Sequence, residues 1–264
     1  MTESTTPAIT PSPESIAKRI RAIRWFHRID LGQGVVTPGD DDSAKKLAQM
    51  RMPETLRGKT FLDIGAWDGF FSFEAERRGA TRVLATDSFV WKGNVPGRSK
   101  DGFLTARSLL GSGVEHLEID PLDISPQSVG MWDVVLFAGV LYHMIHPMLA
   151  LERAASVTKE LLIVETATDL EFVRRPAMAF YPGGELARDA SNWSGVNTRA
   201  LRAMLRHSGF CEVTVVHRKP FHRRVLAAGR WLLQQSPWTT LQQGRIVVHA
   251  RRTPHFGQYG DGAE

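Results

Sequence analysis

Residues 61–72 decide the fold of this chain, and they run Phe61-Leu62-Asp63-Ile64-Gly65-Ala66-Trp67-Asp68-Gly69-Phe70-Phe71-Ser72. An apolar run followed by a glycine turn and a second apolar segment predicts a buried strand, a tight turn and the start of a helix. Gly65 and Gly69 lack a Cβ, so the backbone can turn sharply there and approach a ligand closely. The next predicted strand, residues 82–86, ends on Asp87, 22 residues after Gly65. An acid at that point can accept both ribose hydroxyls of a nucleotide cofactor.

The chemistry of the turn indicates which nucleotide it holds. A dinucleotide site uses G-x-G-x-x-G, so that a pyrophosphate can sit on the helix N-terminus. Here the middle glycine is replaced, and Asp63 and Asp68 flank the turn. Two carboxylates would repel a pyrophosphate but would attract the ammonium and sulfonium groups of S-adenosylmethionine (SAM). The turn therefore favours SAM over NAD.

The pattern Asp63-x-Gly65-x-Trp67-Asp68-Gly69, followed by a strand and an acid, resembles the class I SAM-dependent methyltransferases. Within them, the chain is similar to the group that contains the bacterial enzyme carboxymethylating the wobble uridine of tRNA. It also resembles actinobacterial enzymes that methylate mannose-containing glycans. Further matching segments are residues 25–32 with 37–39, residues 139–143, and Asn192-Trp193 through Gly209-Phe210.

The resemblance implies a set of cofactor contacts. The methionine part of SAM would lie at the glycine turn, and the ribose at Asp87. Asp123, after the third predicted strand, would accept the adenine amino group; a turn or cap role is its alternative. Gly139 opens the loop after the fourth strand. The expected SAM residues are Asp63, Gly65, Trp67, Asp68, Gly69, Asp87, Asp123 and Gly139.

Four further residues are expected to carry catalysis. His143 follows the fourth strand, and its ordinary pKa of about 6.5 suits a general base at physiological pH. Tyr142 would orient SAM or the acceptor. Glu165, at the end of the fifth strand, and Asp169 point toward the same crevice and would form a relay with His143. The same carboxylates offer the oxygen ligands that Mg²⁺ prefers, so a Mg²⁺ site is the alternative.

The sequence departs from the tRNA-modifying group after His143. Those enzymes place arginine there and use a carboxylated SAM, whereas this chain has Met144 and Ile145. The difference favours ordinary SAM and methyl transfer to a hydroxyl of a sugar or short glycan. Modification of a tRNA wobble uridine is the alternative enzyme interpretation. A SAM-binding module without turnover is the non-enzyme alternative.

Composition is that of an ordinary globular protein, with 42% hydrophobic and 23% charged residues among 264. The net charge of +5 admits a nucleic acid or acidic glycan partner, but the basic residues are dispersed along the chain. The single cysteine, Cys211, excludes a disulfide within the chain and fits a cytoplasmic location; we expect it to be buried. No apolar run is long enough to span a membrane.

Alternating strands and helices predict an α/β fold, a doubly wound Rossmann-like sheet of seven mostly parallel strands with its ligand at the carboxyl ends. Strands are expected near residues 60–64, 82–86, 114–118, 132–137, 161–165, 212–217 and 245–251. Within the domain 14–252, residues 14–58 form a helical lid, and insertions 166–196 and 218–244 form a cap. Residues 1–13 and 253–264 are expected to be tails. The isoleucine face of the first helix needs a cover, either a second copy in a homodimer or this chain's own sheet.

Overall fold

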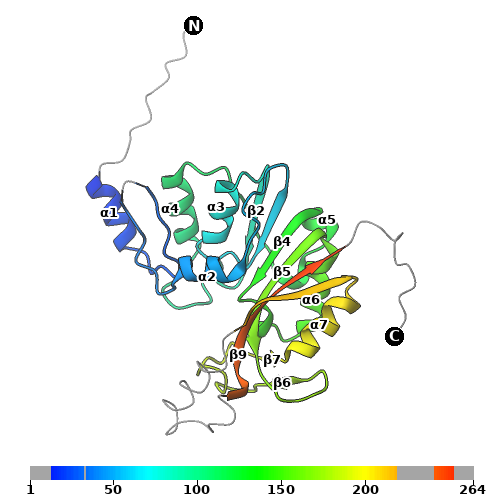
Figure 1. Ribbon diagram of the computed structural model, residues 1–264. Helices are drawn as coiled ribbons and strands as arrows, with labels where there is room; N and C mark the ends of the chain where they lie inside the picture. The colour runs from blue at the N-terminus through cyan, green and yellow to red at the C-terminus, as the bar shows by residue number, and fades with distance from the viewer. Residues whose placement is uncertain (1–12, 33, 219–240, 253–264) are drawn as a thin grey trace.

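The computed structural model describes residues 13–32, 34–218 and 241–252, and they form an α/β fold around one sheet (Figure 1). The strands are β1 (Thr60–Ile64), β2 (Arg82–Asp87), β3 (Glu115–Glu118), β4 (Trp132–Ala138), β5 (Thr158–Thr168), β6 (Met178–Phe180), β7 (Ser194–Val196), β8 (Glu212–Arg218) and β9 (Gly244–Arg251). Strands β3, β2, β1, β4 and β5 lie side by side in that order and run parallel. Beyond β5, β9 pairs antiparallel with both β5 and β8.

Helices cover both faces of the sheet. The helices are α1 (Pro13–Arg21), α2 (Ser43–Met50), α3 (Phe70–Arg77), α4 (Asp101–Leu110), α5 (Pro126–Val129), α6 (Pro147–Ser156) and α7 (Thr198–His207), with 3-10 turns η1 (Pro121–Asp123) and η2 (Leu141–His143). Figure 1 shows α3 and α4 on one side of the sheet and α6 and α7 on the other. The doubly wound arrangement expected from the alternating pattern is confirmed.

Side chains alternate between two hydrophobic clusters, one on each face of the sheet. In β4, Val135 and Phe137 belong to the cluster under α6 and α7, whereas Val134 and Leu136 belong to the cluster under α3 and α4. All four side chains are at most 3% exposed. Strands buried on both faces read as continuous apolar runs, which is why β4 was recognisable from sequence.

The sheet contains more strands than the seven expected. The predicted strands are all present, and β6 and β7 add an antiparallel pair from within the insertion 166–196. Strand β7 joins the sheet through the pairing of Val196 with Thr168 at the end of β5. Residues 166–196, which we expect to form a cap, therefore include strands that extend the sheet itself. Most of the second insertion, and the two tails, lie outside the described residues.

The N-terminal lid segment packs on the α3 and α4 side of the sheet. Ile20 of α1 is only 7% exposed and belongs to the cluster on that side, with Ile16 and Ile23 packed against it. The chain's own core therefore covers the isoleucine face. Cys211 is exposed, so the expectation that it is buried was wrong: it precedes the inward-facing positions of β8. Among the described residues, no helix combines the length and apolarity needed to cross a bilayer.

Candidate active site

The glycine turn joins β1 to α3 at the carboxyl edge of the parallel strands. Gly65 and Gly69 have φ values of 83° and 86°, which side chains with a Cβ rarely adopt. A Cβ on Gly65 would lie 2.3 Å from the Val140 side chain, in the loop after β4. Glycine at position 65 thus lets the turn after β1 approach the loop after β4, which also carries Tyr142 and His143.

Three consecutive backbone amides of this turn are bonded within the protein. The amides of Gly65 and Ala66 both donate to the carbonyl of Thr86, at 2.8 and 2.9 Å. The amide of Trp67 donates to the Asp87 carboxylate at 3.0 Å. A pyrophosphate needs free amides at such a turn. The amides of residues 65–67 are thus occupied by the strand and loop of β2, and the acidic flanks of the turn disfavour a pyrophosphate.

Two carboxylates lie buried beside the turn. Asp63 is 3% exposed, and its Oδ2 accepts a hydrogen bond from the Ser72 hydroxyl at 2.7 Å. Burial raises the pKa of Asp63 to about 7, and the nearby Asp87 carboxylate adds to the shift. Burial also raises the pKa of Asp87. A cation placed here would lower the free energy of both ionised forms, so the site is electrostatically suited to SAM.

Asp68, the other acid of the turn, faces the N-terminal segment. Its Oδ2 accepts hydrogen bonds from the amides of Phe26 and His27, at 2.7 and 2.9 Å. The residue is 2% exposed, and burial raises its pKa to about 6. Asp68 thus docks the N-terminal segment on the turn, and the SAM contact expected of it stays a prediction.

Trp67 extends that docking surface. Its backbone has a φ of 52°, its carbonyl accepts a hydrogen bond from the Trp91 indole, and its ring stacks on Phe26. The guanidinium of Arg98 lies over the Trp67 ring, 5.1 Å from its centroid. Trp67 therefore contacts both the N-terminal segment, through Phe26, and the loop after β2, through Trp91 and Arg98.

Asp120 lies nearer to β3 than Asp123, the acid expected to contact adenine, and it contacts the residue that follows β2. Asp120 lies two residues after the strand and caps η1 by accepting from the Leu122 amide at 2.9 Å, and its Oδ2 accepts a hydrogen bond from the hydroxyl of Ser88, the residue after Asp87, at 3.3 Å. Asp123 lies at the end of η1 and is exposed. Pro121 can start the 3-10 turn, which makes Asp120 its N-cap and leaves Asp123 at its exposed end; the adenine contact expected of Asp123 stays a prediction.

His143 is held in a defined orientation at the end of η2. Its Nδ1 lies 3.0 Å from the carbonyl oxygen of Ser191 and 3.1 Å from the Ser191 hydroxyl. A carbonyl only accepts hydrogen bonds, so Nδ1 carries the proton and Nε2 is the basic nitrogen. Burial lowers the pKa of His143, which keeps the ring neutral at physiological pH. Both properties suit a general base.

Tyr142 contacts an ion pair that crosses from β9 to β5. Arg245 donates to both carboxylate oxygens of Glu165, one of these bonds being 2.6 Å long, and to the Tyr142 hydroxyl at 3.4 Å. The guanidinium also lies 4.8 Å from the Tyr142 ring centroid. Gly139 is adjacent: its amide donates to the Glu165 carbonyl, and a Cβ on it would lie 3.8 Å from the Tyr142 hydroxyl. Arg245 was not anticipated, because nothing in the sequence ties it to residues 80 positions away.

Asp169 is committed to the cap. Its Oδ2 accepts from the Tyr181 hydroxyl at 2.5 Å and from the Gln243 amide at 3.3 Å, and its Oδ1 from the amide of Leu170. The expected relay of Glu165 and Asp169 with His143 is therefore replaced: each acid has other partners, and His143 bonds Ser191. Among the described residues, no group of three His, Cys, Asp or Glu side chains is arranged to hold a metal ion.

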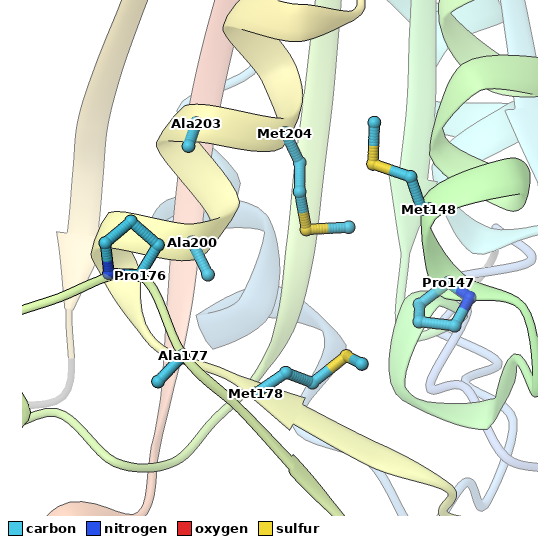
Figure 2. A pocket seen from close by; sticks show the side chains of 8 residues that line it. All are labelled: Pro147, Met148, Pro176, Ala177, Met178, Ala200, Ala203 and Met204. Carbon is cyan, nitrogen blue, oxygen red and sulfur yellow. The ribbon is translucent and has the colours of Figure 1, made fainter.

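An apolar groove of about 280 Å³ opens beside α6 and α7, on the face opposite the glycine turn. Figure 2 shows three methionine side chains, Met148, Met178 and Met204, extending into the same space. The groove begins at Pro147, four residues after His143, but its lining has no charged side chain. It offers apolar contact area and none of the groups that SAM requires.

Comparison with solved structures identifies the fold. The N-terminal domain of EvdMO1, crystallised with S-adenosylhomocysteine (SAH) and D-fucose, matches with a TM-score of 0.61 and 19% identity, covering 91% of this chain and 96% of that domain. The chain spans about half of full-length EvdMO1, 49% of it. A SAM-dependent methyltransferase from Mesorhizobium loti matches with a TM-score of 0.50 and 17% identity, over 81% of this chain and 99% of that one.

The chain has the fold of the SAM-dependent methyltransferases. The [4+2]-cyclase SpnF also matches, with a TM-score of 0.52 and 15% identity over 90% of this chain and 92% of its own. One fold therefore carries different reactions, and the chemistry has to be argued from the site. No protein-family profile matches the sequence, and no curated protein matches it either.

Proposed function

We propose that this chain is a SAM-dependent O-methyltransferase that acts on a hydroxyl group of a sugar or short glycan. The observation that carries the proposal is the orientation of His143. A partly buried, neutral histidine whose Nδ1 proton is fixed by the Ser191 carbonyl presents a basic Nε2. It does so in the loop after β4, against which the glycine turn of β1 packs.

The turn and the neighbouring strand ends support SAM as the cofactor. Asp63 and Asp87 are buried carboxyls whose ionised forms a cation would stabilise, and Asp120 lies near Asp87 through Ser88. SAM would supply an electrophilic methyl group bound to its sulfonium. The acidic environment favours such a cation and disfavours a phosphate ligand.

The protein's own part of the reaction is positioning and proton transfer. The acceptor hydroxyl would lie within hydrogen-bond reach of His143 Nε2, which takes its proton as the new O–C bond forms. Tyr142 precedes the proposed base, and Arg245 donates a hydrogen bond to its hydroxyl. That hydroxyl lies close to Gly139, at the start of the loop after β4. Holding the acceptor hydroxyl in line with the sulfonium methyl group would itself lower the barrier to methyl transfer.

A sugar acceptor is supported by an aromatic pair beside the proposed base. Trp193 follows Ser191 by two residues, and its ring stacks with Phe180 at a centroid distance of 6.1 Å and an angle of 23°. Phe180 is 63% exposed. Flat aromatic faces suit the apolar faces of sugar rings. The structurally similar EvdMO1 domain was crystallised with D-fucose and SAH, which agrees with this choice.

The test is transfer of labelled methyl from SAM into two pools, a cellular oligosaccharide extract and bulk tRNA. Label in the oligosaccharide pool that is lost in His143→Ala, with SAM binding retained, is the expected result. Label in tRNA alone would overturn the sugar acceptor in favour of wobble-uridine modification. SAM binding without label in either pool would favour a non-catalytic module. Parallel reactions with Mg²⁺ and with EDTA establish whether a metal participates.

A further inference from the structure

We infer that Ser191 and Asp189 form a relay with His143 that holds its imidazole in place and stabilises the protonated ring. The inference rests on the proposed function, because it assigns the general base its supporting residues. It differs from the relay expected from sequence, in which Glu165 and Asp169 took this part. Both residues of the new relay belong to the cap segment between β6 and β7.

The hydrogen bonds fix the direction of the relay. The Ser191 hydroxyl donates to Asp189 Oδ1 at 2.7 Å, and the Ser191 amide donates to the same oxygen at 2.9 Å. A hydroxyl has one proton, so toward His143 the Ser191 oxygen can only accept. The Nδ1–H of His143, 3.1 Å away, is the donor that matches it. The Ser191 carbonyl, at 3.0 Å from Nδ1, accepts from the same group.

The two charged groups near His143 shift its pKa in opposite directions. Asp189 favours the protonated ring, whereas Arg245, whose guanidinium lies over the adjoining Tyr142 ring, disfavours it. The Tyr142 ring contacts the imidazole with centroids 4.2 Å apart. Proton uptake at Nε2 places a positive charge in this space, next to a fixed cation. A carboxylate connected through Ser191 to Nδ1 offsets that cost, because its negative charge attracts the imidazolium.

The position of the relay links the base to the cap. The amide of Trp193 donates to the Tyr142 carbonyl at 2.8 Å, so residues 191–193 bond η2 at both His143 and Tyr142. Asn192 between them is buried, at 4% exposure. The same short segment thus orients the base and carries the aromatic ring proposed to bind the acceptor. The geometry makes Ser191 and Asp189 positioning residues, since they act through His143.

The test combines pH profiles with NMR of the full chain. Asp189→Asn keeps an acceptor oxygen but removes the charge. Ser191→Ala removes the hydroxyl but keeps the backbone carbonyl, and Ser191→Thr restores a hydroxyl. Glu212→Gln is the matched control, because Glu212 is an exposed acid at the start of β8. Methyl transfer is measured from pH 5 to 9, and the His143 ring is titrated by ¹H–¹⁵N NMR without any acceptor.

The expected result is a shift specific to the relay. In Asp189→Asn, the acid limb of kcat/KM and the His143 NMR titration both move to lower pH, by about 0.5 to 1 unit, because a charge favouring the imidazolium is gone. We expect kcat to fall about tenfold in Ser191→Ala and to recover in Ser191→Thr, with the Kd for SAM unchanged. Glu212→Gln leaves both titrations in place.

Two outcomes separate this inference from the proposed function. If the His143 titration in Asp189→Asn coincides with that of the wild type, the relay is wrong, whatever the activity. The relay would also be wrong if the rate falls in Asp189→Asn while the acid limb of the kcat/KM profile stays at the same pH. Asp189 would then have a purely structural role. If the NMR titration shifts as expected but no acceptor is methylated, the relay holds and the methyltransferase assignment fails.

Discussion

The rings of Phe26 and Trp67 lie face to face, with centroids 4.1 Å apart and an interplanar angle of 13°. Phe26 belongs to the N-terminal segment, and Trp67 to the glycine turn. The Asp68 carboxylate adds hydrogen bonds from the amides of Phe26 and His27 to this contact. The conformation of the proposed SAM site therefore depends on residues that precede β1.

Removing the Phe26 ring should loosen the turn. In Phe26→Ala, we expect a loss of about 1 to 3 kcal/mol of unfolding free energy, since a half-buried stacked ring is removed. The Kd for SAM should rise as well, because Trp67 loses the surface that orders it. Urea denaturation and calorimetric titration measure the two effects. Val36→Ala, at a 53% exposed position of the same segment, is the control and should match the wild type in both.

SAM affinity should depend on pH through Asp63. Its pKa of about 7 means that the carboxyl is half protonated near neutrality, and a cationic ligand favours the ionised form. SAM should therefore bind more weakly as pH falls through 7, with proton release on binding. Calorimetry at pH 7 in two buffers of different ionisation enthalpy measures that release. We expect Asp63→Asn to abolish it and to weaken SAM binding; proton release that persists in this variant would contradict the assignment.

The same carboxyl should destabilise the ligand-free protein at high pH. The pKa of Asp63 is higher folded than unfolded, so its contribution to stability is complete below about pH 4 and is lost as pH rises through 7. Relative to the wild type, Asp63→Asn should gain about 2 to 4 kcal/mol between pH 4 and pH 8. Urea denaturation at both pH values checks this. An equal difference at the two pH values would show that Asp63 is ionised throughout.

Asp120 and Asp123 make a matched pair for the adenine side of the site. Asp120→Ala should weaken SAM binding about tenfold, as expected for loss of a hydrogen bond to a charged group. Asp123→Ala should stay within about twofold of the wild type, because this residue is exposed at the end of η1. Calorimetric titration distinguishes them. The reverse order of effects would restore the assignment made from sequence.

The parts of the fold that follow local pattern were predictable. The buried strands β1, β2 and β4, the glycine turn and α3 each follow from apolar runs and turn residues within a few positions. The site was predictable where it depends on strand ends, because parallel strands bring their carboxyl ends to one edge. Asp63, Asp87 and His143 lie at or next to that edge, and their roles stay predictions.

Contacts between distant segments were not predictable in the same way. Ser191 meets His143 across 48 residues, and a serine in a cap segment has no pattern that marks it. Short strands of three residues, β6 and β7, carry too little periodicity to be recognised, although they define the cap. Asp68 was assigned to the cofactor because the turn contains it, whereas its side chain direction depends on the lid docked above.

Trp193 should affect the acceptor and leave SAM binding unchanged. In Trp193→Ala, we expect the KM for the sugar acceptor to rise about tenfold, with the Kd for SAM unaltered, because the removed ring is on the cap side. Trp193→Phe keeps a flat ring and should recover most of the loss. Steady-state kinetics with each substrate varied in turn separates the two. A change in SAM affinity in both variants would place the ring at the cofactor instead.

The effects of removing Arg245 and Glu165 on the unfolding free energy should depend on each other, because the two side chains form an ion pair. Glu165 has a side chain only 7% exposed and Arg245 one that is 43% exposed, so removing the arginine leaves a buried carboxylate without its bidentate partner. Arg245→Gln should lower the unfolding free energy by about 2 to 4 kcal/mol, less than for a fully buried pair because water can reach part of the site. In Arg245→Gln with Glu165→Gln, the loss should be smaller than the sum of the single losses by at least about 1 kcal/mol. Urea denaturation of the four proteins in this cycle measures the coupling, and strictly additive losses would show that the pair contributes nothing beyond its separate packing.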